Sequence, residues 1–109
     1  MVAPTARQRL PDRRPCESFA FQCAGLAYVA SISRFPNGDL AEIFISNHKA
    51  GSDADSACKD SAVVASIALQ FGAPLEMIRH ALLRDPRGVA SSPLGVALDL
   101  IAGQDRGQS

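Results

Sequence analysis

The sequence predicts an α+β fold, in which a three-stranded antiparallel sheet (a meander) is followed by three helices packed on one face of that sheet. Apolar and polar residues alternate with a period of two in the first half of the chain, as in half-buried strands. Turn-forming residues interrupt this alternation at Ala24-Gly25 and at Pro36-Asn37-Gly38. After Gly51 the period becomes that of amphipathic helices.

Three strands are expected, at residues 17–24, 26–34 and 39–46. In the first strand Phe19, Phe21 and Cys23 share one face. The third strand is apolar on both faces around Ile43-Phe44-Ile45, which indicates a well-covered strand. The connections between the strands are short, and short connections join antiparallel neighbours.

A long helix is expected over residues 52–71, with Ser52 as its N-cap and Gly72 ending it. Many of the residues predicted to face inward are small, which favours close packing against the sheet or another helix. This predicted stripe comprises Ala54, Cys58, Ser61, Ala65, Ala68 and Phe71 or Gly72, widened by Val64, Ile67 and Leu69.

Two shorter helices are expected after the long one. The first begins at Pro74, a residue suited to the first helical position, and runs to about Leu83. The second begins at Ser92-Pro93 and stops at Gly103. The residues from Gln104 onward are polar and are expected to form a frayed tail.

Length and composition narrow the class of protein. The chain has 109 residues, which allows one domain, and 47 % of them are hydrophobic, so we expect a folded core. Lys+Arg and Asp+Glu number 11 each, which argues against a globally basic nucleic-acid-binding protein. No apolar run reaches the ~18 residues of a membrane span. The three cysteines form no CxxC pair, so reduced thiols in a cytoplasmic protein are expected.

The zero net charge is divided unevenly along the chain. Residues 1–15 carry four arginines against one aspartate, a net +3, so the remainder of the chain carries −3. We expect a flexible basic arm at residues 1–15, a folded domain at residues 16–103 and a polar tail at residues 104–109. The arm is either a solvated tail or a contact with a partner, made by Arg7, Arg9, Arg13 and Arg14.

The densest polar cluster lies between the third strand and the long helix. Here a glycine allows close approach, free amides mark a helix start, and a lysine and a histidine add positive charge. The candidate residues for binding a phosphate or carboxylate are Asn47, His48, Lys49, Gly51 and Ser52. The alternative is a polar connector leading into a capped helix, since Asp53 and Asp55 would repel an anion.

The sequence predicts neither a catalytic residue nor a metal site. The two histidines, His48 and His80, have no ligand spacing such as HxxxH. Cys58 falls on the inward stripe of the long helix, where a buried thiol is inert without a neighbouring base. The turn at residues 84–88 is charged, and it is either structural or a phosphate contact.

Three blocks of sequence together resemble the TSCPD domain. They are Gly38-Asp39-Leu40-Ala41-Glu42-Ile43-Phe44-Ile45, Lys49-Ala50-Gly51-Ser52, and Ser66-Ile67-Ala68-Leu69-Gln70-Phe71-Gly72-Ala73-Pro74-Leu75-Glu76. Ser92-Pro93-Leu94-Gly95-Val96-Ala97-Leu98-Asp99 resembles the proline-marked helix that follows in that family. The resemblance covers about residues 17–102. The Thr-Ser-Cys-Pro-Asp motif itself is missing, and Ser91-Ser92-Pro93 stands near its place.

The TSCPD domain lies near the C-terminus of vitamin B12-dependent (class II) ribonucleotide reductases and also occurs free-standing. The resemblance therefore implies a free-standing accessory or regulatory module in deoxyribonucleotide synthesis, with a reductase large chain or a nucleotide as partner. A 109-residue chain is too short for the reductase barrel. No cofactor is expected on this chain, and adenosylcobalamin is implied only through the family.

A homodimer is also expected. A three-stranded sheet has two free edges, and the apolar segment Ile43-Phe44-Ile45 offers side chains to both faces. Pairing through an edge or through the open face of the sheet would cover these groups.

Overall fold

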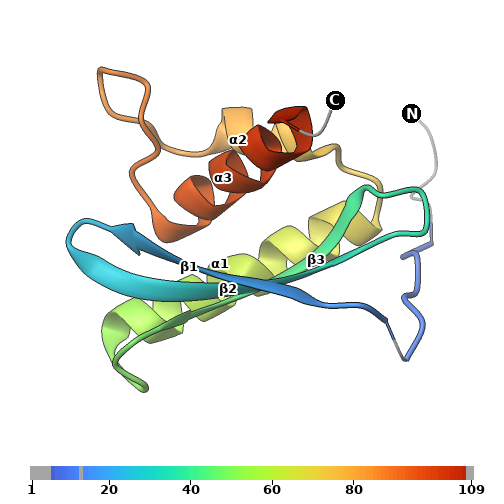
Figure 1. Cartoon of the computed structure of the whole chain (residues 1–109), viewed down its shortest axis with the longest axis horizontal. Helices are drawn as coiled ribbons and strands as arrows, with labels where there is room; N and C mark the ends of the chain where they lie inside the picture. The colour runs from blue at the N-terminus through green and yellow to red at the C-terminus, as the bar shows by residue number, and fades with distance from the viewer. Residues whose placement is uncertain (1–5, 13, 108–109) are drawn as a thin grey trace.

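The structure is a computed structural model of the chain, and it describes residues 6–12 and 14–107. Strands β1 (Glu17–Cys23), β2 (Leu26–Arg34) and β3 (Leu40–Asn47) form an antiparallel sheet in the order β1-β2-β3. Helices α1 (Asp53–Gln70), α2 (Leu75–Ala81) and α3 (Pro93–Gly107) follow (Figure 1). The predicted α+β class, with a meander followed by three helices, is confirmed.

Both predicted turns join the strands. Ala24 and Gly25 have φ angles of 52° and 79°, the left-handed pair required at a two-residue hairpin whose twist matches its strands. At the second turn Gly38 has a φ of 96°, and the side chain of Asn37 accepts a hydrogen bond from the Asp39 amide at 2.9 Å. The register shifts by one residue between Ser33 and Arg34, just before this turn.

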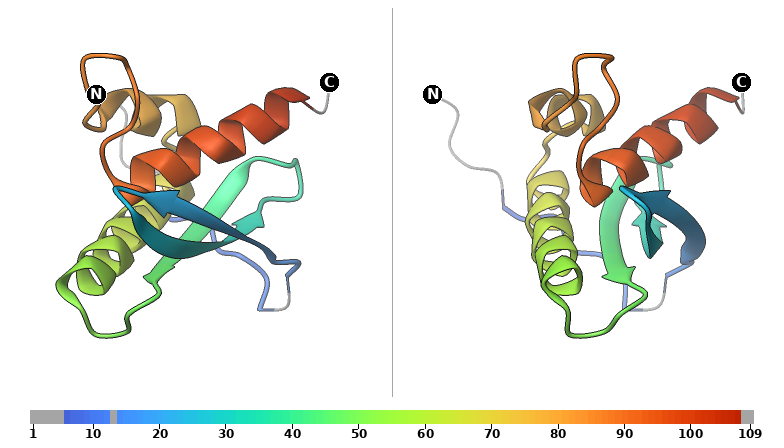
Figure 2. Two further views of the ribbon diagram at one scale, coloured as in Figure 1. Left: turned by 60° about the vertical axis from the view of Figure 1, so that its left-hand side comes forward. Right: turned by 90° about the vertical axis from the view of Figure 1, so that its left-hand side faces the viewer.

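The core lies between one face of the sheet and the helices. Ile32 and Ile43 of the sheet and Leu98 and Ile101 of α3 are its largest fully buried side chains. Figure 2 shows α1 lying along β3, while α3 crosses above the sheet on the side of β1. Helix α2 packs against α3 and contributes Ile78 to the margin of the core.

The buried stripe of α1 differs from the predicted one. Val64 is 67 % exposed and Ile67 is 38 % exposed, although both were expected to face inward. Polar residues take inward positions instead, because their side chains hydrogen-bond to the backbone of β3. The observed buried residues are Asp55, Cys58, Ala62, Ala65, Ser66, Leu69 and Gln70.

The ends of the last two helices also differ from the predictions. Helix α2 ends at Ala81 rather than near Leu83, and α3 continues through Gly103 to Gly107. Asp105, which was assigned to a frayed tail, forms an ion pair with Arg34 of β2 at 3.0 Å. This contact ties the last turns of α3 to the sheet, which local helix propensity at Gly103 could not reveal.

The described part of the arm lies against the domain. The backbone N–H of Gln8 donates to the carbonyl of Gln70 at 2.7 Å, and Arg7 Nε donates to Gln70 Oε1 at 2.6 Å. Arg14 forms an ion pair with Glu42 of β3. The flexibility of the arm remains a prediction, and its residues 1–5 and 13 lie outside the described residues.

Candidate functional site

The predicted anion site folds as one compact connector between β3 and α1. Asn47 is buried at the end of β3, and its side-chain Oδ1 accepts the Lys49 amide at 3.0 Å. The Ser52 hydroxyl donates to the carbonyl of Lys49 at 2.7 Å and accepts the amide of Asp55 at 3.1 Å. Ser52 is therefore the N-cap of α1, as predicted. The structure brings all the candidate residues of this connector together.

The carboxylate of Asp55 accepts hydrogen bonds from the backbone N–H groups that a bound anion would otherwise contact. Its carboxylate accepts hydrogen bonds from the backbone N–H of Asn47 at 2.9 Å and of Gly51 at 3.0 Å. Lys59, one helical turn later, donates to the same carboxylate at 2.8 Å. These three donors lower the pKa of Asp55 to about 2, with the Lys59 hydrogen bond contributing most.

The cations of the connector remain at the surface. Lys49 is exposed, and the His48 ring Nδ1 lies 3.3 Å from the carbonyl oxygen of Ala27. Anion binding at this connector stays a prediction, and it would depend on the side chains of His48 and Lys49. The backbone amides at Lys49 and Gly51 are directed to groups of the chain itself.

Sequence reasoning treated Asp55 as a group that would repel an anion and did not predict its role in the connector. Two signals pointed to it. Asp55 stands three residues after the N-cap Ser52, as the acidic residue of a capping box does, and four residues before Lys59. Its contacts with Asn47 and Gly51 could not be read from either spacing, because they depend on the path of the connector.

The predicted partner-contact arginines surround a second feature, a cavity of about 260 Å³ at the arm. Arg7, Arg9 and Arg14 line it together with Glu42 and Gln70. Arg14 binds both carboxylate oxygens of Glu42, at 2.8 and 3.0 Å. Arg13 lies outside the described residues. Partner contact through these arginines stays a prediction, and the structure shows that two of them also bind this chain.

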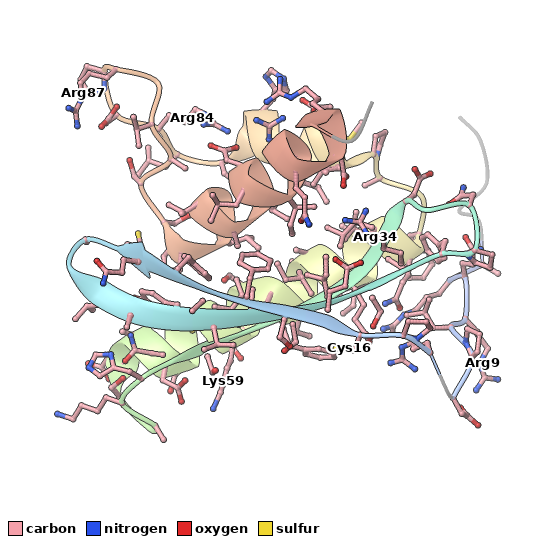
Figure 3. The ribbon with its side chains drawn as sticks, viewed as in Figure 1. Arg9, Cys16, Arg34, Lys59, Arg84 and Arg87 are labelled. Carbon is pink, nitrogen blue, oxygen red and sulfur yellow. The ribbon has the colours of Figure 1, made fainter. Side chains whose placement is uncertain are left out.

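A third charged cluster supports the loop between α2 and α3. Arg84 donates to both carboxylate oxygens of Asp99 in α3, at 2.7 and 2.8 Å, and Arg79 donates to one of them at 2.9 Å. The Arg84 hydrogen bond is the main cause that lowers the pKa of Asp99 to about 2. Figure 3 shows Arg84 at the base of this loop and Arg87 farther out along it.

The turn at residues 84–88 has the internal hydrogen bonds of a structural turn. The carboxylate of Asp85 accepts the amides of Arg87 at 2.8 Å and of Val89 at 3.0 Å. These backbone hydrogen bonds lower the pKa of Asp85, with that from Val89 contributing most. Arg84 also donates to the carbonyl of Gly88 at 3.0 Å, which closes the turn.

The thiols and imidazoles form no clustered site in residues 6–12 and 14–107. No group of three His, Cys, Asp or Glu residues in this part of the chain could hold a metal ion. Burial raises the pKa of the Cys58 thiol, and the thiol donates to the carbonyl of Asp55 at 3.2 Å. His80 is exposed on α2 next to Glu76. Within the same residues, no helix combines the length and the hydropathy needed to cross a membrane.

The four best-defined pockets of the described residues are each too small for adenosylcobalamin, which the family resemblance implies. Four pockets have volumes of about 260 to 380 Å³, at the lower end of the range that suits drug-sized ligands. A corrin ring with its nucleotide loop and adenosyl group is far larger than such a ligand. Neither His48 nor His80 lines any of these four pockets.

Comparison with known proteins finds partial relatives. No family model matches the chain, and no solved structure matches it. A vitamin B12-dependent ribonucleotide reductase of Rhodopirellula baltica is 36 % identical over 72 residues, which are 66 % of this chain and 7 % of that protein. The enzyme of the same name from Streptantibioticus cattleyicolor is 29 % identical over 90 residues, 80 % of this chain and 15 % of that protein.

A further relative of the same name, from Bradyrhizobium diazoefficiens, is 33 % identical over 70 residues. That match covers 64 % of this chain and 6 % of the relative. The chain thus spans between 6 and 15 % of the length of these three relatives. The similarity identifies a ribonucleotide-reductase-related domain.

Proposed function

We propose that the chain is a TSCPD-type module that binds the catalytic chain of a vitamin B12-dependent ribonucleotide reductase and serves deoxyribonucleotide synthesis without performing the reduction itself. One observation carries this proposal. Most of this chain, 66 to 80 % in two relatives, is similar to a small part of reductases that are much longer. A module that matches one small part of a larger enzyme is expected to work in contact with the remainder.

Two carboxylates of the described residues, Asp55 and Asp99, have a structural role rather than a catalytic one. The pKa values of Asp55 and Asp99 are both lowered to about 2, because each carboxylate lies in an ion pair and accepts further hydrogen bonds. Carboxylates held in this way are poor proton acceptors near neutral pH, where a general base needs a pKa close to the working pH. Their arrangement fits the stabilisation of the connector and of the loop between α2 and α3.

The surface offers charged groups for such a contact at two ends of the molecule. Arg9 lies on the arm and Arg87 lies on the loop between α2 and α3, at opposite ends of the molecule (Figure 3). Both side chains are exposed. The arm has the higher positive charge of the two regions, so we place the reductase contact there.

The proposal is tested by measuring binding of the purified chain to the reductase catalytic chain of the same organism. Biolayer interferometry is run without nucleotide and with ATP or dATP, and we expect saturable binding in at least one condition. Arg9→Glu should weaken the complex at least tenfold, whereas the matched variant Arg87→Glu should leave it unchanged. Absence of binding in every condition contradicts the proposed function. Equal effects of the two variants contradict only the placement on the arm.

A further inference from the structure

The arm, β3 and the end of α1 meet around a cavity of about 260 Å³ whose charged lining is mostly positive. Three guanidinium groups and one carboxylate line it, which gives a net charge of +2, and Asp12 of the arm is not among the lining residues. We call it the arm cavity. Its charged and amide side chains are those of Arg7, Gln8, Arg9, Arg14, Glu42 and Gln70.

The carboxylate of the arm cavity is already paired. Glu42 is 8 % exposed, and both of its carboxylate oxygens accept hydrogen bonds from Arg14, at 2.8 and 3.0 Å. This bidentate pair contributes no net charge to the cavity. The remaining positive charge belongs to Arg7 and Arg9, and neither forms an ion pair with residues 6–12 and 14–107.

A buried amide holds Arg7 in place. The Nε of Arg7 donates to Oε1 of Gln70 at 2.6 Å, and Gln70 is 6 % exposed. The same Gln70 side chain donates to the carbonyl of Ala41 in β3 at 3.1 Å, which fixes its orientation. Within the described residues, the two Nη groups of Arg7 have no hydrogen-bond partner. They form the planar fork with which a guanidinium group binds two oxygens of one anion.

We propose that the arm cavity binds a phosphate group of a small molecule, with Arg7 and Arg9 contacting its oxygens. Two like charges that line one small cavity repel each other, and a bound anion removes that repulsion. A phosphate monoester carries a charge of about −1.5 to −2 at pH 7, which matches the net charge of the cavity better than the single charge of a carboxylate does. The cavity is smaller than the ~300–1,000 Å³ of sites for drug-sized ligands, so it suits a phosphate or diphosphate group.

The arm cavity is better suited to an anion than the connector between β3 and α1. At the connector, the carboxylate of Asp55 occupies the backbone amides of Asn47 and Gly51 and would repel an anion. In the arm cavity the carboxylate is paired with Arg14, and two further guanidinium groups remain for a ligand. This inference goes beyond the reductase contact proposed for the arm, because the isolated chain can bind a small phosphate ligand without the reductase.

Titration calorimetry of the full chain with inorganic pyrophosphate tests the proposal. In ~0.15 M salt, attraction between exposed charges is screened beyond about 8 Å, so saturable one-to-one binding reports a defined site. Arg9→Gln should weaken binding at least fivefold. Lys49→Gln in the connector and Arg87→Gln on the loop between α2 and α3 are the matched controls, and both should leave the affinity unchanged. Absence of saturable binding overturns the proposal, as does an effect of Lys49→Gln equal to that of Arg9→Gln.

A second variant tests the geometry of the site. Arg7→Lys keeps the positive charge and loses the planar fork, so we expect pyrophosphate to bind at least threefold more weakly. Far-ultraviolet circular dichroism verifies that each variant is folded. An unchanged affinity of Arg7→Lys would mean that positive charge alone suffices, and it would overturn the assigned role of Arg7.

Nuclear magnetic resonance locates the site in the parent chain. Added pyrophosphate should shift the backbone amide signals of residues 7–10, Glu42 and Gln70, and shifts confined to residues 47–52 would overturn the proposal. Titration with ADP then distinguishes two sources of the phosphate group. Equal affinities for ADP and pyrophosphate support a site for phosphate groups alone, and tighter binding of ADP supports a nucleotide site. Reductase binding is measured separately, so failure to bind pyrophosphate leaves the proposed function unaffected.

Discussion

At the start of α1, the carboxylate of Asp55 connects three parts of the chain. It accepts hydrogen bonds from the end of β3 at Asn47, from the connector at Gly51 and from α1 itself at Lys59. Its side chain is 3 % exposed, so water cannot easily replace these donors. This single carboxylate therefore fixes how the sheet leads into the long helix.

The stability of the fold should depend on the ionisation of Asp55. Its folded pKa is about 2, below the ordinary value of 3.8, so the carboxylate stabilises the folded state above pH ~4 and this contribution is lost as the pH falls toward 2. Asp55→Asn should be less stable at pH 7 and should show a shallower fall in the free energy of unfolding between pH 4 and pH 2. Urea denaturation at a series of pH values measures both effects.

The control for this titration is Asp53→Asn. Asp53 lies in the same helical turn, is exposed, and accepts no hydrogen bond from a side chain or amide of residues 6–12 and 14–107. Its variant should follow the parent curve closely. Parallel curves for the parent chain and Asp55→Asn between pH 4 and pH 2 would show that the carboxylate does not hold the connector.

At the scale of elements, α1 protects the free edge of the sheet. The Ser66 hydroxyl donates to the carbonyl of Ile43 and accepts its amide, both at 2.9 Å. Gln70 donates to the carbonyl of Ala41 at 3.1 Å, and the Cys58 thiol donates to that of Ile45 at 3.5 Å. The helix thus satisfies edge groups of β3 that would otherwise be open to another strand.

Removing the Ser66 hydroxyl should lower the free energy of unfolding, because backbone groups at the edge of β3 lose their hydrogen-bond partner. Ser66→Ala leaves the buried amide and carbonyl of Ile43 without this partner, and we expect a loss of about 1–3 kcal/mol in the free energy of unfolding. Ser56→Ala, on an exposed position of the same helix, should change it by less than ~0.5 kcal/mol. Equal effects in urea denaturation would show that the edge contact contributes nothing.

The same element shows where local pattern and structure diverge. Helical periodicity correctly predicted α1, its N-cap Ser52 and its end at Gly72. It assigned Val64 and Ile67 to the core because both are apolar. The helix instead turns Ser66 and Gln70 inward, since β3 presents unpaired backbone groups there. Hydrophobicity alone could not predict this, because the deciding partners lie 23 and 29 residues away in the sequence.

At the scale of the whole molecule, the basic arm forms an ion pair with an acidic residue of the folded domain in the same chain. The basic arm contacts the domain through Arg14, whose guanidinium pairs with Glu42 of β3 at 2.8 Å. The side chain of Glu42 is 11 % exposed and depends on that partner. Part of the arm therefore contributes to the folded domain, in addition to any contact with another molecule.

Loss of Arg14 should destabilise the fold. Arg14→Ala leaves the carboxylate of Glu42 without its partner, and we expect the free energy of unfolding to fall by about 1–3 kcal/mol. Arg9→Ala is the matched change on the same arm, and it should have an effect below ~0.5 kcal/mol because Arg9 forms no ion pair with the described residues. Thermal or urea unfolding at one protein concentration compares the two. If Arg14→Ala and Arg9→Ala have the same free energy of unfolding, the contact between Arg14 and Glu42 does not stabilise the fold.

The sequence by itself determined the order of strands and helices, the two hairpin turns and the grouping of Asn47, His48, Lys49, Gly51 and Ser52 in one connector. These features depend on the period of the apolar and polar pattern and on the backbone preferences of a few residues. Both act locally along the chain. Only the tertiary structure decided that Asp55 receives the connector amides, that Arg14 and Asp105 bind the sheet, and that Val64 and Ile67 remain outside. Each of these depends on groups distant in sequence, and such contacts leave no local pattern to read.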